Sequence, residues 1–272
     1  MSRKRLMWSL LLLPVLIYVV ICVALFFAQR SLIFPVAQVA TAGPPPPGAE
    51  ALELTGSEGR LRGIHIPPAR QGAERLLLLG FAGNGTNAQR AAVFTAGLAP
   101  EADVVFFHYR GYPPSEGVAS AEALLDDAPR ILDLARARIH PDRTVAVGFS
   151  VGSGVAGTLA ARRPLDGLIL VTPFDSLERV SADHYPWLPV RLLFRHPMEP
   201  ATALAGRSLA VAIIAAGNDQ LVFPRRTEAL RSRLSNIVFD RVIPDTGHND
   251  IYDHPAFAPA FREALDRVVA RR

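Results

Sequence analysis

The order of apolar and polar positions divides the chain into two parts. One apolar run occupies residues 6–28 without a charged residue, whereas from residue 50 onward short apolar segments alternate with segments of helical periodicity. The clearest members of this alternation are Val104–Phe107, Ser120–Arg138, Thr144–Val147, Gly152–Arg162 and Leu168–Val171. Strands that alternate with helices predict an α/β fold with a mostly parallel central sheet flanked by helices.

The pattern also predicts how the chain is divided. We expect a membrane anchor at residues 1–30, a proline-rich linker at residues 31–50 and a single domain at residues 51–272. The run Pro44–Pro47 should make residues 42–48 a stiff, extended spacer. The domain should open with a hairpin whose strands are Leu52–Leu54 and Leu61–Ile66.

The first apolar run is long enough to cross a bilayer. Leu6–Ala28 is 23 residues without a charge, and about 20 apolar residues span a hydrocarbon core of about 30 Å. A cleaved signal peptide is the alternative, but its apolar region would be about 7–15 residues long. Basic residues crowd the N-terminal side (Arg3, Lys4, Arg5), so we expect a cytosolic N-terminus and an outward-facing domain, periplasmic in a bacterium.

The most specific chemical signal is the sequence GFSVG at residues 148–152, which follows the strand Thr144–Val147 and precedes a helix of small residues. A sharp turn between a strand and a helix lifts a serine side chain out of the sheet, where a base can reach it. Glycines at both ends of the motif allow the backbone to bend. This context predicts Ser150 as a nucleophile.

A serine nucleophile needs a histidine base and an acid that orients it, and on this scaffold they follow in the order Ser, Asp, His. His248 lies in a loop directly after the apolar run Phe239–Ile243, so we predict it as the base. Asp219 follows the strand Val211–Ala215 and is the leading candidate for the acid. Asp175, which follows the preceding strand, and Asp245, which lies close to His248 in sequence, remain alternatives.

The predicted oxyanion hole uses backbone amides. One donor should be Val151, the residue after the nucleophile, and the other should come from the glycine-rich loop after the strand Leu76–Leu79. Phe81 is our candidate in that loop, which has the sequence GFAGNG at residues 80–85. A plain Gly/Asn turn is the alternative interpretation of this loop.

With these residues in place, the chain resembles the α/β-hydrolase superfamily, and within it the single-pass, membrane-anchored α/β-hydrolase-domain proteins. Their segment HGNAGN is similar to residues 79–84, although Leu79 replaces the histidine and Phe81 the asparagine. Their segment DYRGYGxSxG is similar to residues 108–117, with His108 in place of the aspartate, and we interpret this segment as structural. The resemblance implies an α/β-hydrolase fold with a short lid, preceded by one transmembrane helix.

The lid that the resemblance implies falls at Tyr185–Phe194, which we call the lid segment. Its prolines and aromatic residues suggest an apolar flap over the site that would suit an acyl chain. A buried connector between two late strands is the alternative.

Composition narrows the function further. The formal charge of +4 and the pI near 9.7 come from dispersed arginines, with no basic stripe and no nucleic-acid motif, so we expect no nucleic-acid partner. The sequence contains neither a His-x-x-x-His pair nor a cysteine cluster, so we expect no metal or other cofactor. The single cysteine, Cys22, lies in the apolar run and cannot form an intrachain disulfide.

The residues together predict a membrane-anchored serine hydrolase that cleaves carboxylic ester or thioester bonds of an acyl substrate. Amide or peptide hydrolysis uses the same machinery, and the sequence does not separate these bonds. A non-catalytic interaction domain with a hydrolase fold is the alternative of a different class, because a fold does not dictate a function.

Overall fold

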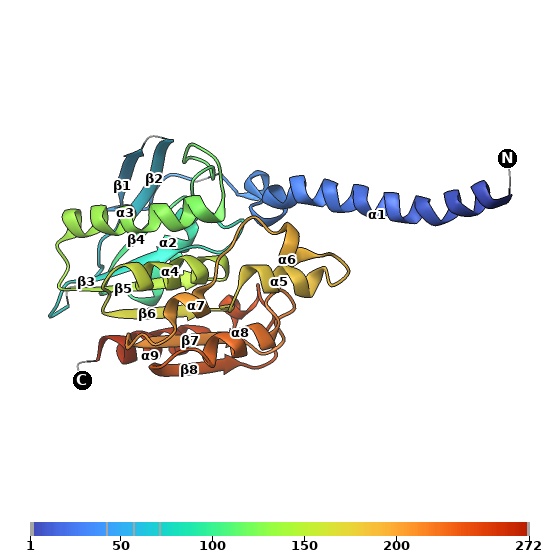
Figure 1. Cartoon of the computed structure of the whole chain (residues 1–272). Coiled ribbons are helices and arrows are strands. Elements are labelled where there is room, and N and C mark those ends of the chain that lie inside the picture. The colour runs from blue at the N-terminus through green and yellow to red at the C-terminus, as the bar shows by residue number, and fades with distance from the viewer. Residues whose placement is uncertain (1–2, 42, 57, 71, 271–272) are drawn as a thin grey trace.

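The computed structural model describes residues 3–41, 43–56, 58–70 and 72–270. The first two residues of the predicted anchor, Ala42 of the predicted linker and the last two residues of the predicted domain lie outside this set. Within it, a long N-terminal helix extends from a layered α/β domain (Figure 1).

The domain is built on one eight-stranded sheet in the order β1-β2-β4-β3-β5-β6-β7-β8. The strands are β1 (Glu50–Gly56), β2 (Gly59–Ile66), β3 (Leu76–Phe81), β4 (Asp103–Phe107), β5 (Arg143–Phe149), β6 (Gly167–Val171), β7 (Val211–Ala216) and β8 (Ile237–Ile243). β1 and β2 form the predicted antiparallel hairpin, and β2 pairs antiparallel with β4, whereas every pair from β4 to β8 is parallel. The predicted fold class is therefore confirmed.

Helices follow the strands and cover both faces of the sheet. They are α1 (Arg3–Ile33), α2 (Ala88–Leu98), α3 (Ala121–Ile139), α4 (Val151–Arg162), α5 (Leu177–His184), α6 (Val190–Leu193), α7 (Pro200–Leu204), α8 (Pro224–Arg231) and α9 (Phe257–Val269), with short 3-10 turns at Val36–Gln38 and Ile251–Asp253. Side chains of α3, α4 and α7 pack in one buried cluster, and side chains of α2 and α9 pack in the other.

The two-sided core explains the continuous apolar strands. Leu77 and Leu79 of β3 belong to one cluster and Leu78 belongs to the other, and all three are fully buried. A parallel strand covered by helices on both faces needs an apolar side chain at every position, because successive side chains point to opposite faces. Helix starts are set by side chains as well: Asn87 caps α2 and Ser120 caps α3 by accepting a backbone N–H.

The N-terminal helix and the proline-rich segment are tied to the domain. α1 is long and apolar enough to cross a membrane, a test that a signal sequence also passes. Directly after it, the Phe34 side chain is buried in the core. The Asn87 side chain donates to the Ala40 carbonyl at 2.7 Å, and Gln89 donates to the carbonyls of Gly43 and Pro44. The segment that we expected to be a spacer thus lies against α2.

Candidate active site

The candidate nucleophile sits in a strained turn between β5 and α4. Ser150 has φ 51° and ψ −119°, in the left-handed half of φ space, which L side chains rarely adopt. Its amide donates to the Val171 carbonyl of β6 at 2.9 Å, and its carbonyl accepts from the Ser153 amide at 2.8 Å. The turn is therefore fixed from both sides, as expected for a serine that must project above the sheet.

The two glycines of the motif are required by close approach of backbone to backbone. A Cβ on Gly148 would overlap the carbonyl of Gly152, and a Cβ on Gly152 would overlap the carbonyls of Phe81 and Ala82. Each approach is under 3.0 Å, closer than real Cβ atoms come to a neighbour. The glycines thus allow the loop after β3 to lie directly against the start of α4.

The structure brings three of the predicted side chains into one hydrogen-bonded relay. His248 Nε2 lies 2.8 Å from Ser150 Oγ, and His248 Nδ1 lies 2.7 Å from Asp219 Oδ2. The imidazole and the carboxylate are both buried. Because a carboxylate only accepts, His248 donates from Nδ1, which leaves Nε2 to accept the Ser150 proton.

The acid of this relay is anchored by the loop that carries it. The other carboxylate oxygen of Asp219 accepts the amides of Leu221 at 2.9 Å and Val222 at 2.7 Å. These bonds hold the carboxylate in place and leave Oδ2 for His248. Asp219 comes directly after β7, so its position follows from the end of a late parallel strand.

The alternative acids have other surroundings. The Asp175 carboxylate faces arginines, with Oδ2 at 3.3 Å from Arg226 and 3.6 Å from Arg179, and burial raises its pKa. Asp245 is exposed in the turn before His248 and has φ 56°. The described structure therefore pairs His248 with Asp219 and places the other two carboxylates elsewhere.

The relay opens into a cavity of about 340 Å³, within the size range of small-molecule sites. Besides Ser150 and His248, its lining residues are Gly83, Asn84, Thr86, Arg90, Ala91, Phe94, Phe149, Leu221, Asn249, Tyr252 and Asp253. Burial raises the pKa of Tyr252 to about 12, so its phenol stays neutral near pH 7. Sequence reasoning did not select Phe94 or Arg90, because nothing local in α2 indicates that one of its faces meets the site.

Comparisons with known proteins agree with this fold. No family model matches the chain. It is 32% identical over 207 residues to an uncharacterized protein of Mycobacterium tuberculosis, covering 75% of this chain and 74% of that protein. Among solved structures, an α/β hydrolase of Vibrio vulnificus superposes with a TM-score of 0.67 at 18% identity, covering 89% of this chain and 91% of its own. The chain has the α/β-hydrolase fold and belongs to the same family as the Mycobacterium tuberculosis protein.

Two further comparisons match the chain to an esterase and to a lipase. A Pyrococcus furiosus esterase superposes with a TM-score of 0.65 at 16% identity, covering 85% of this chain and 96% of the esterase, a likeness of fold alone. The lysophosphatidylserine lipase ABHD12 of Danio rerio is 31% identical over 126 residues, which are 44% of this chain and 32% of the lipase.

The predicted oxyanion donors lie on two segments that meet at the turn of Ser150. Phe81 is the last residue of β3 and Val151 the first residue of α4. The loop after β3 runs beside the serine, since a Cβ on Gly83 would lie 3.7 Å from the Ser150 Cβ. The role of the two amides remains a prediction.

Tyrosines from the segment after β4 support that loop. Tyr109 Oη donates to the Ala82 carbonyl and Tyr112 Oη donates to Asn84 Oδ1, both at 2.8 Å. Residues 108–117 therefore hold the glycine-rich loop, in agreement with the structural interpretation of that segment. His108 in the same segment is buried, which lowers its pKa to about 4 and keeps it neutral.

The lid segment lies away from the cavity at Ser150. Among the described residues, none from Tyr185 to Phe194 lines the cavity at Ser150, and the segment packs beside α1 instead. The expectation of a flap directly over the serine is not what the structure describes. Nor does the described part of the chain contain a group of three or more His, Cys, Asp or Glu side chains arranged to hold a metal ion.

Proposed function

We propose that this α/β hydrolase cleaves carboxylic ester or thioester bonds through an acyl-enzyme on Ser150. The observation that carries the proposal is the relay in which Asp219, His248 and Ser150 are joined by hydrogen bonds of 2.7 and 2.8 Å. This is the arrangement of nucleophile, base and orienting acid that activates a serine hydroxyl.

The reaction proceeds in two half-reactions. Ser150 Oγ attacks the carbonyl carbon while His248 Nε2 takes the hydroxyl proton, and the amides of Phe81 and Val151 stabilise the negative charge on the carbonyl oxygen. His248 then gives its proton to the leaving alcohol or thiol, and the acyl group stays on Ser150. A water molecule, deprotonated by His248, releases the acid and restores the serine.

The cavity supports an acyl substrate. Aromatic and aliphatic side chains, among them Phe94, Phe149, Leu221 and Tyr252, line it together with a few polar groups. Such a lining removes acyl methylenes from water, each worth about 0.8 kcal/mol. An ester of a lipid is also the substrate class that the name of the Danio rerio lipase indicates for that protein.

We further propose that α1 is a retained membrane anchor, with its N-terminus in the cytosol and the hydrolase domain outside. Its contact with the domain supports retention, because Phe34 is buried in the core immediately after the helix. In membranes extracted with carbonate, the mature protein should remain in the pellet and keep residues 1–30. A C-terminal alkaline phosphatase fusion should be active; a soluble product starting after Ala28 or an inactive fusion would contradict the proposal.

The test of the catalytic proposal is labelling by a fluorophosphonate probe. The full chain should be labelled and Ser150→Ala should not, because the probe needs an activated serine. Ser153→Ala is the matched control, since Ser153 lies three residues further on and is fully buried. Labelling that survives in Ser150→Ala would contradict Ser150 as the nucleophile, and absence of labelling in the unmodified chain would favour a non-catalytic domain.

A further inference from the structure

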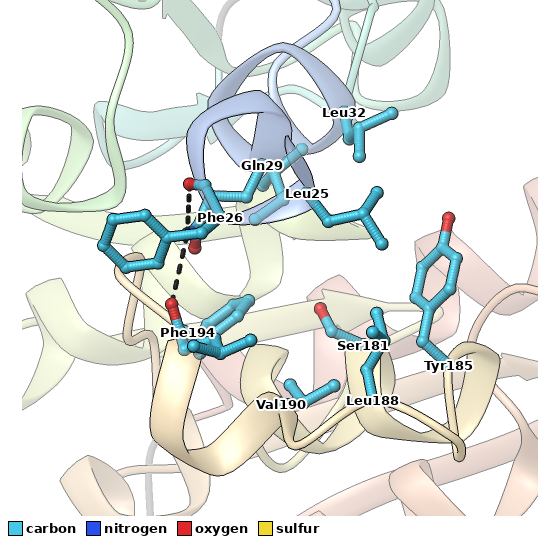
Figure 2. A pocket seen from close by; sticks show the side chains of 11 residues that line it. Leu25, Phe26, Gln29, Leu32, Ser181, Tyr185, Leu188, Val190 and Phe194 are labelled. Atoms are coloured by element: carbon cyan, nitrogen blue, oxygen red, sulfur yellow. Dashed lines mark hydrogen bonds between the residues drawn. The ribbon is translucent and has the colours of Figure 1, made fainter. Parts of the chain in front are cut away.

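The lid segment is joined side by side to α1. Tyr18 Oη of α1 donates to the Trp187 carbonyl at 3.0 Å, and the two rings meet edge to face with centroids 6.5 Å apart. About three turns nearer the domain, Gln29 contacts the other end of the segment. Its amide nitrogen donates to the Leu193 carbonyl at 3.1 Å (Figure 2). Its amide oxygen accepts the Arg195 N–H at 2.8 Å.

Apolar side chains fill most of the space between these contacts. A groove runs between α1, which contributes Leu25, Phe26 and Leu32, and the lid segment, which contributes Leu188, Val190 and other apolar residues. Figure 2 shows these side chains facing a common space. Nearly all of the groove surface is apolar, so it offers little to water or to a polar ligand.

The outer side of the lid segment is apolar too. The side chains of Leu192, Trp187 and Tyr185 are 85%, 52% and 39% exposed. The outward-facing side of α1 carries similarly exposed Leu, Val and Ile side chains from Leu12 to Val23. Exposed apolar surface that continues from a candidate membrane span onto a neighbouring segment marks a lipid contact.

The backbone of the lid segment suits hydrocarbon. Pro186 and Pro189 have no N–H, and the amides of Leu188, Val190 and Phe194 donate within the segment. The carbonyls of Trp187 and Leu193 accept from Tyr18 and Gln29 on α1. Irregular backbone tolerates membrane depth only where its polar groups are satisfied by protein, and here α1 supplies the partners of these two carbonyls.

The position of Tyr18 sets the depth. A hydrocarbon core of about 30 Å takes about 20 helical residues, so a core that starts at Leu6 ends near Leu25. Tyr18 then lies about 10 Å inside the outer face, at a rise of about 1.5 Å per residue. The tip of the lid segment, which contacts Tyr18, lies at a similar depth.

Given the proposed membrane anchoring, on which this inference rests, we propose that the tip of the lid segment is immersed in the outer half of the bilayer and that its groove with α1, which begins at Leu25 near the outer face of the core, takes the headgroup-proximal end of an acyl chain of the surrounding lipid. The helix that leads into the segment also touches the active site: His184 Nε2 contacts the Leu221 carbonyl at 2.8 Å, and Leu221 lines the Ser150 cavity. The substrate class is accordingly an acyl ester embedded in the same membrane. Arg191, 90% exposed, has a side chain long enough to extend toward the headgroups.

The test uses the tryptophan in the lid segment as a depth probe. The chain has two tryptophans, Trp8 and Trp187, so Trp8→Phe leaves a single reporter. The full-length variant is reconstituted in phosphatidylcholine vesicles whose acyl chains carry bromine near the carboxyl end or near the methyl end. We expect roughly twofold quenching of Trp187 emission, stronger with bromine near the methyl end, because the contact with Tyr18 places Trp187 about 10 Å below the outer face of a core whose midplane lies at about 15 Å.

The matched control moves the reporter to the far end of the sheet. In a chain with Trp8→Phe, Trp187→Phe and Arg207→Trp, the tryptophan lies in the exposed turn before β7, and bromine should not quench it. Flotation of the vesicles reports anchoring separately. A chain that does not float with vesicles defeats the anchor proposal. A chain that floats but whose Trp187 is quenched by aqueous acrylamide and not by bromine overturns the immersion of the lid segment and leaves the anchor standing.

Discussion

The turn at Ser150 and the contact between the lid segment and α1 are held together in opposite ways. At the turn, backbone packs on backbone so closely that two glycines are required, and the surroundings are fully buried. At the lid, two polar side chains of α1 satisfy backbone groups across a largely exposed apolar surface. The first region is held by packing within the protein alone, whereas the second, under the proposed immersion, would be complete only when lipid covers its outer side.

The first region was predictable from sequence because its parts are local. The strand, the turn residues and the helix of small residues are adjacent in the chain, and strand order then indicates where the base and an acid follow. The structure pairs His248 with Asp219, the leading candidate, although the sequence left Asp175 and Asp245 open. The sequence did not decide between these carboxylates, because the decision depends on the loop after Asp219, whose amides orient the Asp219 carboxylate toward His248.

The second region was not predictable in the same way. Tyr18 and Trp187 are 169 residues apart, and neither residue carries a local signal that names the other. The composition of the lid segment indicated an apolar contact, and we expected that contact to lie over the active site. Helix α1 provides the surface instead, and the groove between α1 and the lid segment is more uniformly apolar than the cavity at Ser150, which is lined partly by polar groups.

The largest expected effect tests the rigid region. Ser150→Ala should lower ester turnover by a factor on the order of 10⁶, and His248→Ala should do the same, because the members of the relay act as one unit. Steady-state hydrolysis of a p-nitrophenyl ester measures the loss. Ser153→Ala should retain activity. If Ser153→Ala abolished activity and Ser150→Ala did not, the assignment of Ser150 as the nucleophile would be wrong.

The acid gives the next largest effect. Asp219→Asn should lower the turnover rate by roughly 10⁴, because an amide no longer fixes the imidazole in the tautomer that accepts the serine proton. Asp175→Asn is the comparison, and its effect on rate should be far smaller since its carboxylate faces Arg226. Greater sensitivity at Asp175 than at Asp219 would move the acid to the loop after β6.

Close packing at the turn predicts a loss of stability. Gly152→Ala places a methyl group on the Phe81 carbonyl, and overpacking of this kind lowers the free energy of unfolding by about 1–3 kcal/mol. Gly97→Ala in α2 is the matched control: a Cβ there meets nothing within 4 Å, and alanine should raise stability by up to about 1 kcal/mol. Urea unfolding in detergent compares the midpoints of the Gly152→Ala and Gly97→Ala chains. Equal midpoints would mean that the turn has room for the added methyl group, against the close approach to the Phe81 carbonyl.

The smallest expected effect is confined to the lid contact. Gln29→Ala removes the acceptor of the Arg195 amide, and a hydrogen bond worth about 1 kcal/mol corresponds to roughly fivefold faster hydrogen exchange at that amide. Mass spectrometry of the detergent-solubilised chain should show the change in peptides that cover residues 190–196. Gln38→Ala, which alters the same residue type just beyond α1, should leave those peptides unchanged.

In both variants the Ser150 amide should stay protected, because its donation to the Val171 carbonyl does not depend on α1. Equal exchange of the lid peptides in the two variants would mean that Gln29 does not hold the segment. Faster exchange at Ser150 as well would mean that the two regions unfold together, and the distinction between a rigid turn and a lipid-dependent lid would fail.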